Sequence, residues 1–178
     1  MVDATLWPPV ISATAALAGA LIGATASAGG QIYLKSKETT ERRKSLGYSL
    51  AAEIESYLNI IDRRDRVHQT ENLVKLARSG VLVPLGGWFT KDERRKDFFP
   101  IFKANLSSIG ILGCELSRVL GRFHREIEAV FATMSDAEDG VYDSYTAPQR
   151  ADLIEGELEV WRGAVNTGKK LVQDLYLL

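Results

Sequence analysis

Hydrophobic and polar residues divide the chain into a long uncharged stretch near the N-terminus and several shorter helical stripes. No residue between positions 4 and 34 carries a charge. At roughly 1.5 Å of rise per residue, a helix over residues 10–34 is about 37 Å long, which exceeds a hydrocarbon core of about 30 Å. We therefore predict a transmembrane helix over residues 10–34, preceded by a short N-terminal tail.

A cluster of basic residues directly follows this stretch, and no Lys or Arg precedes it. The cluster consists of Lys35, Lys37, Arg42, Arg43 and Lys44. Because basic flanking residues stay on the cytoplasmic side, the pattern predicts a single-pass protein of the bacterial inner membrane with its N-terminus outside and its C-terminal part in the cytoplasm. The same side chains would contact membrane lipid headgroups. In an alternative interpretation, Ala26-Ser27-Ala28 is a signal-peptide cleavage site, although the usual positive n-region is missing.

Small residues form a stripe along the predicted membrane helix. Ala15, Gly19, Gly23 and Ser27 stand at every fourth position. Small side chains at this spacing let the backbones of two helices approach closely in lipid. The stripe predicts a homo-oligomer held through the transmembrane helix. A single Ala-rich anchor that packs against nothing is the alternative.

Three later stretches place apolar residues at helical spacing. They cover residues 46–61, 114–134 and 154–175, where apolar positions advance by three or four. This spacing collects them on one face of an amphipathic helix. Val, Ile and Thr do not alternate as half-buried strands require. We therefore predict an all-α fold, in which an antiparallel helical bundle follows one N-terminal transmembrane helix.

The helical stripes and charge clusters predict three parts in the chain. Residues 1–34 form the tail and transmembrane helix, residues 35–45 a basic juxtamembrane segment, and residues 46–178 the cytoplasmic bundle. Inside the bundle, residues 81–87 contain Pro84 and paired glycines, which interrupt regular structure. We expect a connector with at most one short strand there.

Composition narrows the class of protein. The chain has 178 residues, of which 46% are hydrophobic, and its formal net charge is −1. Its one cysteine, Cys114, excludes an intramolecular disulfide and a cysteine-based metal domain, and we interpret it as a small core residue. A pI of about 6.2, with acidic residues interrupting the basic runs, argues against nucleic acid as a partner.

The candidate chemical motifs are incomplete, so we predict no enzymatic activity, no cofactor and no metal. Gly163 to Lys169 matches the start of a phosphate-binding loop, but Lys170 stands where that loop needs Ser or Thr, and we interpret its glycines as part of a packed helix. His68 and His124 have carboxylates three or four positions away without the pattern of a bundle metal site, and we assign them to solvated polar faces. The acidic residues 135–160 lack the ligand spacing of a calcium loop.

The run FFPIFKANLSSIGIL at residues 98–112, followed by the helical stripe up to residue 134, resembles a segment of small bacterial single-span membrane proteins of unknown function. Those proteins also place a basic stretch and a long helix after one N-terminal span. The resemblance implies the same architecture and transfers no active site.

These features predict a membrane-anchored helical scaffold or protein-interaction module with an unknown protein partner. One alternative is an enzyme or ligand-binding bundle, in which His68, His124 or Asn105 would converge on a buried pocket. A membrane pore protein of the phage type is another alternative, favoured by the small residues of the predicted span.

Overall fold

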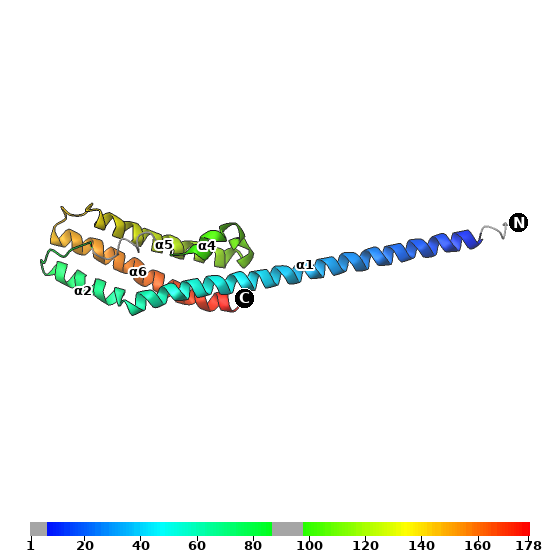
Figure 1. Cartoon of the computed structure of the whole chain (residues 1–178), viewed down its shortest axis with the longest axis horizontal. Helices are drawn as coiled ribbons and strands as arrows, with labels where there is room; N and C mark the ends of the chain where they lie inside the picture. Colours follow the sequence, from blue (N-terminus) through cyan, green and yellow to red (C-terminus); the bar gives the residue numbers. More distant parts are fainter. Residues whose placement is uncertain (1–6, 87–97) are drawn as a thin grey trace. The chain divides into compact units, whose positions relative to one another are not determined.

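The computed structural model describes residues 7–86 and 98–178, and within these ranges it describes the side chains of residue 27 and of residues from 29 onward. The elements in chain order are α1 (Trp7–Arg63), α2 (Arg66–Arg78), α4 (Pro100–Ala104), the 3-10 helix η2 (Leu106–Leu112), α5 (Cys114–Glu138) and α6 (Ala147–Tyr176). Figure 1 shows these helices, and no strand occurs in the described ranges. The all-α prediction is therefore confirmed.

The membrane part of the prediction is wrong. In the part of the chain that the structure describes, none of the helices combines the length and the apolar character that a membrane crossing needs. Helix α1 includes residues 10–34 but continues through the charged cluster to Arg63. Ala, Gly, Ser and Thr fill 16 of the 25 positions from 10 to 34, and such small side chains contribute little hydrophobicity. This finding overturns the predicted transmembrane helix, single-pass topology and inner-membrane localisation.

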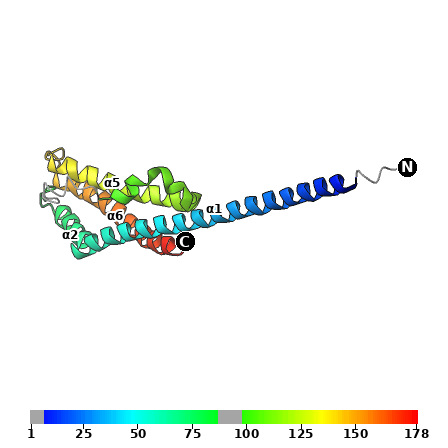
Figure 2. The same cartoon turned by 45° about the vertical axis from the view of Figure 1, so that its right-hand side comes forward.

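The chain divides into two compact units, residues 1–42 and residues 43–178. Helix α1 contributes its N-terminal part to the first unit and its C-terminal part to the second. In the first unit, all residues from 29 to 42 are exposed. In the second unit, α6 packs against both α2 and α5, and Figures 1 and 2 agree that the three helices lie side by side. This unit is a helical bundle.

A left-handed residue separates α1 from α2. Asp65 has φ 49° and ψ 37°, and its backbone N–H donates to the carbonyl of Asp62 at 2.9 Å. Aspartate is one of the few residues other than glycine that tolerates this conformation. The chain therefore turns at Asp65 and starts a second helix, α2, at the next residue.

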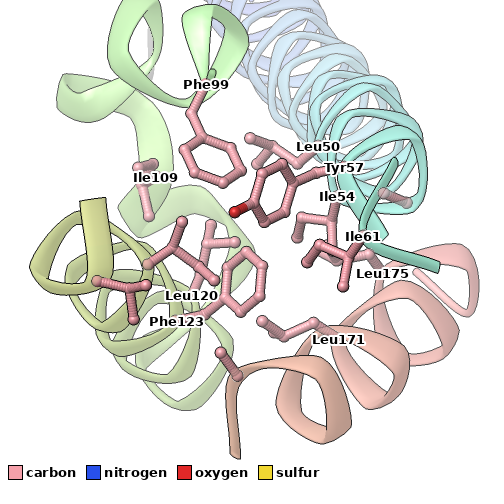
Figure 3. Close-up of a cluster of buried hydrophobic side chains, with 14 of the residues drawn as sticks. Leu50, Ile54, Tyr57, Ile61, Phe99, Ile109, Leu120, Phe123, Leu171 and Leu175 are labelled. Carbon is pink, nitrogen blue, oxygen red and sulfur yellow. The ribbon is translucent and has the colours of Figure 1, made fainter. Parts of the chain in front are cut away.

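The bundle core is built from the predicted apolar stripes (Figure 3). The stripe of α1 supplies Leu50, Ile54, Tyr57 and Ile61, all buried. The other buried residues of this core come from later in the chain; they are Phe99, directly before α4, and Ile109, Leu120, Phe123, Ile127, Leu171 and Leu175 from the later helices. Spacing by three and four thus identified the buried faces of α1, α5 and α6 correctly.

A buried arginine holds residues 81–86, the described part of the connector that follows α2. The Arg150 guanidinium donates to the carbonyl oxygens of Val83 at 2.7 Å, Asp143 at 2.9 Å and Tyr145 at 3.0 Å. Residues 81–86 contain no strand. Backbone carbonyls that a buried loop would leave unpaired are satisfied here by one cation. Arg150 thereby joins the connector to the turn between α5 and α6.

Candidate functional site

The predicted helix-packing stripe falls largely outside what the structure describes. The side chains of Ala15, Gly19 and Gly23 lie outside the described residues, and Ser27 is exposed. The homo-oligomer that this stripe predicts stays a prediction.

The predicted basic cluster divides between the two units. Lys35, Lys37 and Arg42 are exposed on α1. The Arg43 guanidinium donates to the carbonyl of Leu112 at 3.2 Å, at the end of η2, and Lys44 is half-buried. Because Arg43 satisfies a helix-terminal carbonyl, this residue helps to hold the bundle together, a role that the sequence did not indicate.

The polar residues that would have marked a shared pocket are not brought together. His68 is exposed, with Nδ1 3.7 Å from Glu71, whereas His124 is buried inside α5. Asn105 donates through Nδ2 to the carbonyl of Ile101 at 2.8 Å, within its own turn. Among the described residues, no group of three His, Cys, Asp or Glu side chains could hold a metal ion.

His124 is a core residue, which corrects its assignment to a solvated face. Only 2% of it is exposed, and its ring stacks on Phe102 with centroids 3.5 Å apart. Nδ1 lies 2.8 Å from the Leu120 carbonyl, which only accepts, so Nδ1 carries the proton. Nε2 is buried with no hydrogen-bond partner among the described residues. Burial lowers the His124 pKa to about 4, so the ring is neutral at pH 7.

The interpretations of Cys114 and of the phosphate-loop-like glycines have different outcomes. Cys114 is exposed, so its assignment to the core is wrong. It is the first residue of α5, and it follows Gly113, whose φ of 97° requires glycine. Both phosphate-loop-like glycines lie inside α6, as interpreted, but Gly163 is exposed and only Gly168 lies on the packed face of the helix. A Cβ on Gly168 would come within 2.9 Å of Phe123, so this glycine permits close packing.

Ion pairs connect α6 with α2, and each helix supplies both acidic and basic partners. Arg78 pairs with Asp152 at 2.7 Å and with Glu155 at 2.5 Å, and Arg162 pairs with Glu71 at 2.5 Å. The hydrogen bond from Arg162 lowers the Glu71 pKa. These exposed pairs link the two helices and add little to stability.

One small hollow lies between α2, α5, α6 and the connector. It has a volume of about 40 Å³. Its lining is mostly apolar and consists of Thr70, Leu85, Thr133, Met134, Ala137, Leu153, Ile154, Glu157 and Trp161. Burial raises the Glu157 pKa, and a hydrogen bond with the Thr133 hydroxyl partly offsets this effect. A carboxyl group at the edge of an apolar cavity is a common arrangement in ligand sites.

A wider groove lies between α1 and α4. Its volume is about 530 Å³, and Ser56, Ile60 and Ile101 are among its lining residues. The buried Glu53 carboxylate forms part of the wall and accepts the backbone N–H groups of Ile101 at 2.6 Å and Phe102 at 3.0 Å. Glu53 thus satisfies the first N–H groups of α4 and fixes this short helix on α1.

A third hollow follows the break at Asp65. It measures about 340 Å³, and its polar lining includes Asp62, Asp65, Arg66 and Lys169. Both signs of charge are represented, and most of these side chains are exposed. The arrangement is typical of a solvated surface cleft.

The first unit presents large apolar side chains to solvent. Ile32, Tyr33 and Leu34 are 71%, 69% and 65% exposed, and they follow one another along α1. Scattered exposed apolar residues are ordinary, but a contiguous group usually marks a contact surface.

Comparisons with protein-family models, with curated proteins and with solved structures find no match for this chain. The resemblance to small bacterial single-span proteins therefore stays untested, and function must be inferred from the geometry.

Proposed function

We propose that this chain is a helical interaction module that self-associates through the N-terminal part of α1. The observation that carries the proposal is the exposure of Ile32, Tyr33 and Leu34. Neighbouring residues of an α-helix are about 100° apart, so these three cover about 200° of the helix surface. Apolar contact is therefore available on more than one side of the helix, which favours assembly with more than one neighbouring copy.

Packing would also stabilise a helix that is weak by itself. Gly29 and Gly30 stand side by side inside α1, and each costs about 1 kcal/mol relative to Ala in a helix interior. Most helices in proteins gain their stability from an apolar face that is packed against another element. Burial of Ile32 and Leu34 against further copies would contribute about 1.5–3 kcal/mol per side chain if it were complete.

The charges beyond these apolar residues are compatible with contacts between identical chains. Lys35 and Lys37 are followed by Glu38 and Glu41, all exposed on the same helix. Because Glu38 and Glu41 stand among the basic residues, they partly offset the repulsion between the like charges of two copies. A second copy also supplies the same apolar residues, as symmetric homo-oligomers do.

Sedimentation equilibrium on the full chain tests the proposal. The natural sequence should form oligomers, and Ile32→Glu combined with Leu34→Glu should reduce them to monomers. The matched control is Leu82→Glu combined with Val141→Glu, which removes two apolar side chains of the bundle that are 61% and 58% exposed. This control should keep the oligomer. A monomeric natural chain, or equal dissociation of both double variants, refutes the proposal.

A further inference from the structure

The hollow between α2, α5 and α6 exists only in the folded bundle. Met134 comes from α5, Ile154 and Trp161 come from α6, and Leu85 comes from the connector that Arg150 holds in place. All four side chains are buried. The apolar part of the hollow is therefore preformed, as small-molecule sites usually are.

The polar groups of this lining favour a ligand that donates hydrogen bonds. Glu157 is the one ionisable side chain among the described lining residues, and no cation is among them. The Thr70 hydroxyl already donates to the Arg66 carbonyl at 2.7 Å, so its oxygen has only acceptor capacity left. A carboxylate and a hydroxyl acceptor together match an ammonium group and would disfavour a carboxylate ligand.

The size of the hollow limits the apolar part of such a ligand. A cavity needs a volume of about 10–15 Å³ to hold one water molecule. The 40 Å³ available therefore hold about three or four non-hydrogen atoms, the size of a short alkyl chain. Glu157 is half-buried, so a cation that pairs with this carboxylate keeps part of its own hydration shell. The free-energy cost of taking the cation out of water is therefore limited.

We propose that this hollow binds the alkyl end of a small primary ammonium compound, with the Glu157 carboxylate pairing with the ammonium group and Trp161 contacting the alkyl chain. This ligand site lies within the second unit and is independent of the proposed self-association through α1.

Titration of the ¹⁵N-labelled full chain with n-butylammonium chloride tests the proposal by NMR. The expected result is a saturable shift of the Trp161 indole N–H and of the Glu157 amide. The neutral analogue 1-butanol should bind about tenfold more weakly, because it lacks the charge-assisted hydrogen bond to the carboxylate. Sodium butyrate should cause no shift of these two signals.

Two carboxylates of α6 provide a matched pair of variants. Glu157→Gln should reduce butylammonium affinity to that of butanol, whereas Glu159→Gln changes an exposed carboxylate two positions away and should leave the affinity unchanged. The Ile32→Glu and Leu34→Glu chain should bind as the natural chain does, which separates this test from that of self-association. Equal affinity for butanol and butylammonium, unchanged affinity in Glu157→Gln, or the lack of any saturable shift overturns the proposal.

Discussion

Two glycines of α6, five residues apart, should respond in opposite ways to replacement by alanine. Gly163 has no atom within 4 Å of the position that a Cβ would take. At Gly168, the same Cβ would lie 2.9 Å from Cε2 of Phe123 and 3.2 Å from Cδ2 of Leu58. Phe123 is fully buried, so its ring has little room to move away.

The magnitudes follow from two opposing effects. Alanine in place of glycine inside a helix stabilises by about 1 kcal/mol. Gly163→Ala should therefore raise the free energy of unfolding by about that amount. Gly168→Ala gains the same helix term but overpacks the core, which costs about 1–3 kcal/mol. Its net effect should lie between about zero and 2 kcal/mol of destabilisation.

Urea unfolding of both variants, followed by circular dichroism at the helix band, measures the difference. The two midpoints should move in opposite directions from that of the natural chain, or Gly168→Ala should stay at the natural value while Gly163→Ala rises. If Gly168→Ala stabilises as much as Gly163→Ala, α6 does not pack against Phe123 and Leu58 as described, and the packing argument fails.

Three further perturbations concern buried polar groups. The Tyr57 hydroxyl points into the core (Figure 3) and has no hydrogen-bond partner among the described residues. Tyr57→Phe should therefore leave the free energy of unfolding, measured by thermal denaturation, unchanged or raise it by about 1 kcal/mol. A loss of more than about 1 kcal/mol would show that the hydroxyl has a partner. His124 has a pKa of about 4 when folded, below its ordinary value of 6.5, so the unfolded chain binds more protons between these values. The contribution of neutral His124 to the free energy of unfolding should be fully present above pH 6.5 and should fall by about 3 kcal/mol as the pH drops to 4. In urea titrations over this pH range, His124→Gln should show a smaller fall than the natural chain. Arg150→Met removes three hydrogen bonds from a cation to backbone carbonyls and should lower the free energy of unfolding by about 3 kcal/mol. Amide hydrogen exchange around Val83 should become faster. Unchanged exchange there would contradict the connecting role of Arg150.

The helical faces of the bundle were predictable from the sequence because they depend on local periodicity. Leu50, Leu120 and Leu175 lie in stripes with spacings of three and four, and all three are buried where these stripes place them. The membrane prediction failed for a physical reason of another kind. A stretch without charges is not the same as a strongly apolar stretch: Ala, Gly, Ser and Thr fill 16 of the 25 positions from 10 to 34, and such small side chains contribute little hydrophobicity.

The buried charges could not be predicted, since their partners are backbone groups far away in sequence. Glu53 accepts N–H groups that follow it by 48 and 49 residues, and one Arg150 bond spans 67 residues. No periodicity connects such positions. His124 was misassigned for a related reason: its neighbour Phe102 lies on a different helix, and only tertiary packing brings the two rings together. The carboxyl of Glu157 had no sequence signal beyond its place among many acidic residues.

The order of synthesis makes folding of the bundle depend on α6. Helices α2 and α5 both pack against α6, and α6 follows both of them in the chain, so it is translated after them. The surfaces of α2 and α5 that contact α6 therefore stay without this partner until the 30-residue helix has been translated, and the bundle cannot finish folding before then. The N-terminal part of α1 is finished long before. Neighbouring nascent chains could thus meet through α1 while their bundles are still unfolded, and a premature stop within α6 would leave α2 and α5 exposed to aggregation.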